Sequence, residues 1–586
     1  MFKLFKNFDK KDISFILICA VGVVIQVWLE LKMPDYMSTI TRLVQTEGSE
    51  MHDILQNGAY MLACAAGSLS TAILTGYFAS RVAATLSLKV RKLLFSKVES
   101  LSLHEVKAFS TSSLITRTTN DITQIQMFVG MGMQVMMRAP IMAIWAITKI
   151  LNKGFEWSIL TAGCVMVLLI TIFIMLKVVI PKFKVIQTLT DKLNGITREN
   201  LTGIRVVRAF NAESYQEDKF DYANKELTET QLFTQYGMAC LMPIMNLVMY
   251  GLTLGIYFIG AYLIHDALMA DKITIFSNMV VFSSYAMQVI MAFLMLALIF
   301  MILPRAQVSA KRINEVLETD VSIQEGTFNH KTEQKGCVSF KNVSFKYPDA
   351  DDYLLKNISF EAHTGDTIAI IGMTGSGKSS LINLIPRFYD VSEGEVLVDG
   401  INVKDYTEQC LHNKIGYVSQ KAILFDSSIK ENIAYGDNGK GPISLEKVKE
   451  AIEVAQGKEF VEQMDDTYDA HIAQGGTNVS GGQKQRLSIA RAIARDPEIY
   501  IFDDTFSALD YKTDATLRKA LKKYTKDATT FIVAQRIGTI LNADKIIVLE
   551  DGEIVGMATH KELLQSCAIY QEIAYSQLSK EELENA

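Results

Sequence analysis

A glycine-rich stretch at residues 372–380, GMTGSGKSS, has the spacing G-x-x-x-x-G-K-[ST], and it directly follows the apolar run TIAII. Glycines with this spacing let successive backbone N–H groups surround phosphate oxygens, and the N-terminus of a following helix adds positive potential. We therefore expect Lys378 to reach the β- and γ-phosphates of a nucleotide, and Ser379 to reach Mg²⁺. A glycine-rich turn without function is the weaker alternative, because the strand and helix context is also present.

A second acidic motif lies downstream. The segment EIYIFDD, residues 498–504, is an apolar strand that ends in Asp503 and Asp504. In phosphate-loop sites the first carboxylate after such a strand holds the Mg²⁺ ion. On its own this pattern is weak evidence, but after a phosphate loop it predicts a complete nucleotide site.

The segment between these motifs carries a family resemblance that covers essentially the whole chain. NVSGGQKQR, residues 478–486, resembles the signature of ABC ATPases, and LSIARAIARDP follows it. GYVSQ resembles the Q-loop, SALD at 507–510 resembles the D-loop, and Tyr347 resembles the aromatic residue that stacks on adenine. Taken alone, Tyr347 is equally well explained as an ordinary strand aromatic. SSLITRTTNDI and ENLTGIRVVRAFNAE resemble the two intracellular loops of ABC exporters with six spans per half.

This resemblance implies ATP and Mg²⁺ as ligands. In ABC ATPases two ATP-binding domains enclose two ATP molecules, each held by the Walker motifs of one subunit and the signature of the other. A chain with one such domain is then half of the machine. The residues expected to contact ATP are Tyr347, Gly372, Met373, Thr374, Gly375, Ser376, Gly377, Lys378, Ser379, Ser380, Ser480, Gly481, Gly482 and Gln483. Those expected at the metal are Ser379, Gln420 and Asp503, and the catalytic positions are Gln420, Asp504 and Gln535.

Two catalytic positions depart from the family pattern, which has Glu directly after the Walker B Asp and His before R-x-x-T. This chain has Asp504 and Gln535 there. Asp is one methylene shorter than Glu and should reach the attacking water poorly, and the amide of Gln can donate a hydrogen bond but cannot carry the charge of a histidine. The pair resembles the degenerate subunit of heterodimeric bacterial multidrug exporters of the type IV fold. Tolerated drift in a homodimer is the alternative, but it would impair both ATP sites.

Composition agrees with a membrane part joined to a water-soluble part. The chain has 586 residues, of which 49% are hydrophobic, and a net charge of −6. This charge disfavours a nucleic-acid binder, which needs an excess of Lys and Arg. The seven cysteines are scattered without a CxxC pair, so neither a zinc site nor a disulfide framework is indicated.

Six apolar stretches free of acidic and lysine residues are long enough to cross a bilayer. They are Ile13–Leu29, Ile54–Ser80, Met131–Thr148, Trp157–Leu176, Thr230–His265 and Ile273–Pro304. Because the first stretch is long and lacks a cleavage signal, we expect a retained span and not a signal peptide. The loops on one side, including the N-terminus, carry twenty Lys and Arg residues against five on the other, which predicts cytoplasmic termini and a cytoplasmic ATP-binding domain.

We therefore expect an all-α six-helix transmembrane domain over residues 1–325, followed by an α/β P-loop nucleotide-binding domain of ABC type over 326–586. The expected function is a cell-membrane, multi-pass exporter subunit that moves amphipathic drugs or other small molecules. Its partner would be a homologous half-transporter with intact Glu and His, and hydrolysis would occur mainly at the partner's site. The alternatives are an ATP-gated switch or channel, and an exporter of a specific peptide, lipid or porphyrin.

Signals for the cargo are weaker. Four methionines of the fifth span fall on one helix face, and three of the sixth span repeat at a spacing of four; they are Met238, Met242, Met245, Met249, Met287, Met291 and Met295. Flexible thioethers suit a cavity for varied apolar molecules, but ordinary helix packing is the preferred explanation. Arg138 interrupts the third span. It could face a cavity or a partner carboxylate, but snorkelling toward the cytoplasmic surface is preferred.

Overall fold

The computed structural model describes residues 2–6, 8–46, 48–151 and 154–578. It divides into two compact units, which we describe separately. The first comprises residues 1–99 and 110–319, and the second comprises residues 100–109 and 320–586. The expected domain boundary, between residues 325 and 326, falls within the second unit. Residues 579–586 of the expected ATP-binding domain lie outside the described residues.

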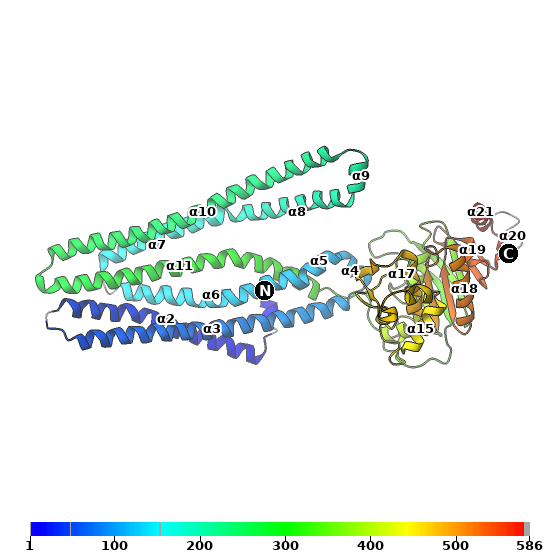
Figure 1. Cartoon of the computed structure of the whole chain (residues 1–586), viewed down its shortest axis with the longest axis horizontal. Coiled ribbons are helices and arrows are strands. Elements are labelled where there is room, and N and C mark those ends of the chain that lie inside the picture. Colours follow the sequence, from blue (N-terminus) through cyan, green and yellow to red (C-terminus); the bar gives the residue numbers. More distant parts are fainter. Residues whose placement is uncertain (1, 7, 47, 152–153, 579–586) are drawn as a thin grey trace. The chain divides into compact units, whose positions relative to one another are not determined.

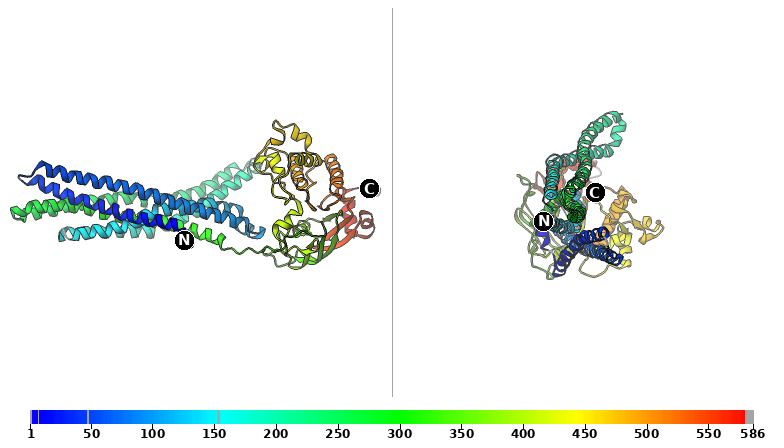
Figure 2. Two further views of the ribbon diagram at one scale, coloured as in Figure 1. Left: turned by 90° about the horizontal axis from the view of Figure 1, so that it is seen from below. Right: turned by 90° about the vertical axis from the view of Figure 1, so that its left-hand side faces the viewer.

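In the described part of the first unit, every element is helical. The helices are α1 (Phe2–Phe5), α2 (Lys10–Gln45), α3 (Met51–Glu99), α5 (Thr111–Thr116), the π-helical segment η1 (Arg117–Asp121), α6 (Ile122–Leu151), α7 (Phe155–Val178), α8 (Ile180–Thr202), α9 (Ile204–Ala209), α10 (Glu213–Asp266) and α11 (Met269–Leu317). The long helices run alongside one another in two perpendicular views (Figures 1 and 2). Contacts join α2 to α3, α6 to α11, and α10 to α7 and α8.

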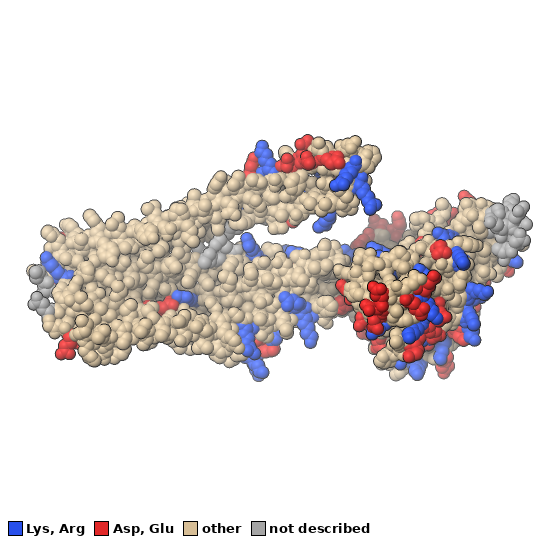
Figure 3. All heavy atoms as spheres, in the orientation of Figure 1, with Lys and Arg blue, Asp and Glu red and all other residues tan. Residues whose placement is uncertain are grey.

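Six of these helical stretches are long and apolar enough to cross a membrane, as the sequence predicts. In the space-filling view the first unit shows few charges over much of its length, and Lys, Arg, Asp and Glu gather where α8, α9 and α10 meet (Figure 3). The helices extend well beyond the charge-free windows. The first window ended at Leu29, whereas α2 continues through Glu30 to Gln45.

The core of the first unit is built around α11. Phe282 and Tyr285 are fully buried, and Trp157 of α7 packs against Phe282. Small residues such as Ala286 and Ala292 are also fully buried, which lets neighbouring backbones approach closely. Pro34, Pro140, Pro243 and Pro304 lie inside long helices, where packing against neighbours tolerates them.

The described part of the second unit contains three sheets. Its strands are β1 (Val338–Phe345), β2 (Leu355–Ala362), β3 (Thr367–Gly372), β4 (Glu393–Val398), β5 (Ile401–Asn402), β6 (Ile415–Val418), β7 (Ser427–Ser428), β8 (His471–Ile472), β9 (Ile499–Asp503), β10 (Thr529–Val533), β11 (Lys545–Glu550) and β12 (Glu553–Ala558). The sheet orders are β2-β1-β4-β5, β12-β11-β3-β10-β9-β6 and β7-β8. In the six-stranded sheet, β11, β3, β10, β9 and β6 are mutually parallel, and β12 is antiparallel to β11.

The second unit also contains helices, as expected for an α/β domain. They are α4 (Leu103–Phe109), α12 (Lys378–Asn383), α13 (Glu408–Asn413), α14 (Ile429–Ile433), α15 (Leu445–Val454), α16 (Lys458–Glu462), α17 (Gly481–Ala494), α18 (Tyr511–Tyr524), α19 (Ile537–Ile540), α20 (His560–Ser566) and α21 (Ala568–Gln577). The two segments that the sequence predicts as strands, TIAII and EIYIFDD, form β3 and β9. Strands β11 and β12 form a hairpin, because Asp551 and Gly552 both have positive φ and turn the chain.

Candidate nucleotide site

The site lies where four neighbouring parallel strands end. The phosphate loop follows β3, and Gln535 follows β10. Asp503 is the last residue of β9 and Asp504 comes directly after it, while Gln420 follows β6. These strands are consecutive in the sheet order β3-β10-β9-β6. Because the carboxyl ends of parallel strands meet at one sheet edge, residues that are distant in sequence come together there.

The phosphate loop has the geometry that its sequence predicts. Gly375 and Gly377 have φ of 91° and 93°, a conformation that side chains rarely adopt, so glycine is needed at both positions. Lys378 opens α12, and its Nζ donates to the carbonyls of Gly372 at 2.9 Å and Met373 at 2.7 Å. This holds the ammonium group inside the loop.

Two of the three expected Mg²⁺ ligands, Ser379 and Asp503, lie together. The Ser379 hydroxyl donates to Asp503 Oδ1 at 2.8 Å. A hydroxyl and a carboxylate suit Mg²⁺, which takes oxygen ligands and is usually bound by few protein groups. The residues present therefore fit this ion, which would supply positive charge to the phosphate oxygens when bound. The third expected ligand, Gln420, donates from its Nε2 to Asp504 Oδ2 at 3.3 Å.

The two departing catalytic positions touch each other. Gln535 Nε2 donates to Asp504 Oδ2 at 2.8 Å, so one carboxylate oxygen accepts from both Gln535 and Gln420. Asp504 is 9% exposed, and its φ is 45°, which Asp tolerates better than most residues. Backbone bonds fix this turn, because Asp504 N donates to Val533 O and Ser507 Oγ donates to Asp504 O.

Burial changes the acidity of this cluster. It raises the pKa of the Asp503 carboxyl and of the Asp504 carboxyl above the ordinary 3.8, and it lowers the pKa of the Lys378 ammonium below the ordinary 10.5. Removal from water disfavours each charged form. The charges at the site are therefore retained over a narrower pH range than in free side chains.

This gives a pH prediction. Mg²⁺-dependent ATP affinity needs ionised Asp503 and protonated Lys378, so we expect it to fall on the acid side before pH reaches 3.8 and on the alkaline side before pH reaches 10.5. Fluorescent ATP-analogue binding with and without Mg²⁺ measures this. Asp503→Asn should remove the acid limb and the Mg²⁺ dependence together, and an unchanged acid limb in this variant would assign it to another group.

The signature residues cap a helix. Ser480 precedes α17, its Oγ accepts from Gln483 N at 3.3 Å, and Gln483 Oε1 accepts from Ser480 N at 2.8 Å. This reciprocal capping box fixes the entry to the helix and leaves Gly481 and Gly482 with open backbone at its N-terminus. Such a terminus favours a phosphate. Gly482 lies beside Ala508 and Leu509 of the expected D-loop.

Tyr347 has neighbours that the sequence did not indicate. Its hydroxyl is hydrogen-bonded to Ser380 Oγ at 2.8 Å, and its ring meets Tyr389 edge-on at 5.1 Å. Lys107 of α4 lies 5.8 Å from the Tyr347 ring centroid and donates to the Tyr389 hydroxyl at 3.1 Å. A segment between the second and third expected spans thus contacts the expected adenine-stacking residue. In the sequence, Lys107 contributed only to the basic character of that loop, which does not indicate which residues Lys107 contacts.

A second polar cluster lies in the helical unit. Arg138 Nη2 donates to both carboxylate oxygens of Glu30 at 2.9 Å. The preferred expectation that Arg138 snorkels is therefore wrong, and the alternative of a partner carboxylate holds. Glu30 was missed because the search for charge-free windows ended the first span at the preceding residue. The methionines of the two spans lie in different surroundings. Met245 of the fifth span is buried in the helical core, whereas Met287 of the sixth span lines a cavity.

Comparisons with known proteins agree with this architecture. Residues 13–320 match the ABC transporter transmembrane region, and residues 355–507 match the ABC transporter ATP-binding model. An uncharacterized ABC transporter ATP-binding protein of Mycobacterium tuberculosis is 37% identical over 92% of this chain and 93% of its own length. The ATP-dependent lipid A-core flippase of Pseudomonas aeruginosa is 31% identical over 84% of this chain and 80% of its own length.

A solved structure of a bacterial Atm1-family ABC exporter with ATP bound has the same fold. It superposes with a TM-score of 0.77 at 23% identity, covering 95% of this chain and 98% of that one. Membership of this family implies ATP hydrolysis coupled to translocation, and the six apolar helices indicate a membrane protein. The chain belongs to the ABC transporter family, with an ABC transporter transmembrane region fused to an ATP-binding domain.

Proposed function

We propose that this chain is the degenerate-site subunit of a heterodimeric exporter of amphipathic small molecules, with its termini and ATP-binding domain in the cytoplasm. It binds ATP and Mg²⁺ at its own phosphate loop and turns the nucleotide over slowly. Its signature, Ser480–Gln483, completes a competent site on the Walker motifs of a homologous partner with Glu and His. ATP binding closes the two domains, and hydrolysis at the partner's site resets them.

The contact between Gln535 and Asp504 carries this proposal. A general base has to lie within hydrogen-bond reach of the attacking water, or act through one more water. The Asp504 carboxylate is short, nearly buried, and already accepts from two amides. Neither amide can take the proton or carry a positive charge. In contrast, Lys378, Ser379 and Asp503 have the arrangement that ATP binding needs, so binding and turnover are separated in this site.

Two alternatives remain distinct in their predictions. An ATP-gated switch or channel would need no hydrolysis anywhere, and the ordered signature at α17 then lacks a use. Export of a lipid draws support from the flippase among the relatives, but the named substrate belongs to that protein. Both alternatives keep the ATP site as described. The channel differs in needing no hydrolysis at a partner's site, and the lipid exporter differs in the molecule that is moved.

Reconstitution tests the proposal. The chain alone, in lipid nanodiscs, should bind Mg·ATP but hydrolyse it slowly, and addition of a homologous half-transporter with Glu and His should raise the rate by about 10²-fold or more. Ser480→Ala in the mixed pair should abolish most of that rise. Thr559→Ala is the matched control, because Thr559 and Glu562 form a similar capping box at α20 and loss of either cap costs about 1 kcal/mol.

Brisk hydrolysis by the chain alone would refute the degenerate assignment. An equal loss of rate in Ser480→Ala and Thr559→Ala would mean that Ser480 only caps its helix and does not contribute to the partner's ATP site. A mixed pair that moves ions without any ATP turnover would favour the gated channel instead.

A further inference from the structure

In the polar cluster of the helical unit, the Glu30 carboxylate accepts hydrogen bonds from three side chains. Besides Arg138, Glu30 Oε1 accepts from Gln26 Nε2 at 3.0 Å and from Ser68 Oγ at 3.1 Å. The Glu30 side chain is 13% exposed and that of Arg138 is 28% exposed. An acid within a membrane-spanning helix is costly unless it is paired, and here its charge is fully compensated. Together the two side chains are electrically neutral.

Two hydrogen-bonding atoms beside this pair have no partner in the described part of the protein. They are Arg138 Nε and Gln288 Oε1, and both are buried. Buried polar atoms are nearly always satisfied, so a spare donor and a spare acceptor at one place need an explanation. The acceptor belongs to α11 and the donor to α6, and both residues line one cavity.

This cavity, of about 560 Å³, is formed by α2, α3, α6 and α11. Both polar side chains and flexible thioethers line it. The methionines are Met33, Met142, Met287, Met291 and Met295, and the polar residues are Gln26, Glu30, Ser68, Arg138 and Gln288. The sixth-span methionines thus face a cavity, and their softness lets them adapt to varied apolar groups. A volume in this range fits a small organic molecule.

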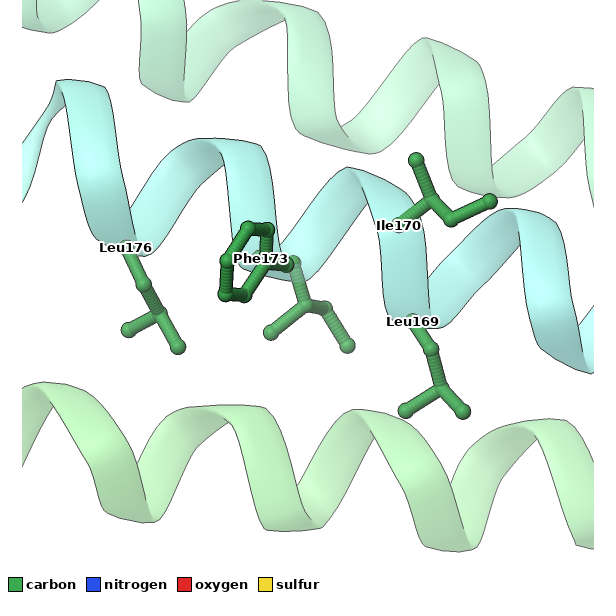
Figure 4. Close-up of a pocket in the computed structure, with 5 residues that line it drawn as sticks. Leu169, Ile170, Phe173 and Leu176 are labelled. Atoms are coloured by element: carbon green, nitrogen blue, oxygen red, sulfur yellow. The ribbon is translucent and has the colours of Figure 1, made fainter.

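A second cavity in the same unit provides a contrast. It measures about 400 Å³ and is lined by apolar residues of α7 alone, including Leu169, Phe173 and Leu176, which point to the same side of the helix (Figure 4). With no polar group to orient a ligand, this surface suits lipid chains. Of these two cavities, the one beside Glu30 and Arg138 combines a neutral ion pair with unused hydrogen-bonding atoms.

We propose that the cavity beside Glu30 and Arg138 binds uncharged amphipathic molecules that carry a secondary amide. Small rotations of the two side chains would turn these buried atoms toward the ligand, so that the amide oxygen accepts from Arg138 Nε, the amide N–H donates to Gln288 Oε1 and the apolar body contacts the methionines. A net charge on the ligand is disfavoured because the ion pair is already neutral and the surroundings are apolar. This inference rests on the proposed export of amphipathic molecules and names their chemical class.

Photolabelling of the full chain in nanodiscs tests it. The probe is N-methyldodecanamide with a diazirine in its tail, compared with the methyl ester, the carboxylate and the trimethylammonium compound of equal tail length. We expect the amide to label α11 near Met291 and to bind about 10-fold more tightly than the ester, which leaves Gln288 Oε1 unpaired. The charged probes should bind still more weakly.

Two variants assign the atoms. Gln288→Met has a similar volume and should remove the preference for amide over ester, while Arg138→Lys keeps the pair with Glu30 but lacks the spare N–H and should weaken amide and ester alike. Met242→Ala is the control, because Met242 is 68% exposed on α10 and lies outside the cavity lining. ATP labelling at the phosphate loop, measured in parallel, reports separately on the proposed ATP-site function.

Labelling that is equal for all four headgroups, or that spreads over α7, would show simple partition into lipid and overturn the proposal. An unchanged amide preference in Gln288→Met would do the same. So would loss of all α11 labelling when the partner half is added, since the cavity would then be covered in the assembled exporter.

Discussion

Restoring the two departing residues should turn this chain into a competent ATPase. We expect Asp504→Glu combined with Gln535→His to raise the turnover number of the chain purified alone by about 10²-fold, because a positioned general base is worth at least that much. The extra methylene extends the carboxylate toward the attacking water. The histidine supplies a side chain that can carry charge near the γ-phosphate. Steady-state phosphate release measures the rate.

The single variants separate the two contributions. Asp504→Glu alone keeps Gln535 Nε2 within reach of the longer carboxylate, so we expect a smaller gain than in the double variant. Adding Lys378→Ala to the double variant should abolish the activity, since the phosphate loop loses its cation. If the unmodified chain already hydrolyses ATP as fast as the double variant, Asp504 and Gln535 are tolerated residues and the two-subunit assignment fails.

Local chemistry made the phosphate loop predictable from the sequence. Its glycines, Lys378 and Ser379 are contiguous, so one stretch contains both the turn geometry and the functional groups. Asp503 was also predictable, because the end of an apolar strand defines its place. The direct bond from Gln535 to Asp504 was not, because it depends on β10 lying beside β9, and strand order is a property of the whole sheet.

The membrane unit shows why the other residues escaped. A span search that penalises charge stops at Glu30, yet the bundle accepts that acid once Arg138, Gln26 and Ser68 satisfy it. The cost of a charge is set by its partners, which the search cannot see. Lys107 escaped for a related reason, since its contacts with Tyr347 and Tyr389 join segments more than two hundred residues apart. Composition identified the basic loop but not its target.

Removing one member of the membrane ion pair should have the largest effect on stability. Arg138→Met leaves the Glu30 carboxylate with only Gln26 and Ser68 as donors, and breaking a buried pair from one side costs about 3–5 kcal/mol. Glu30→Gln should cost a similar amount by leaving the guanidinium unpaired. The double variant Glu30→Gln with Arg138→Met removes both charges and should recover most of the loss. Denaturant titration of purified protein in detergent measures the free energy of unfolding.

An exposed pair in the same unit provides the reference. Lys192 and Glu226 are 3.1 Å apart, but their side chains are 49% and 48% exposed, so Lys192→Met should cost no more than about 1 kcal/mol. The diagnostic quantity is therefore the coupling in the double-variant cycle, which should be large and favourable for Glu30 with Arg138 and near zero for the exposed pair. Costs that simply add in the membrane pair would mean that each charge is solvated by other groups. The cavity beside this pair would then contain water, and its buried polar atoms would be hydrogen-bonded to that water.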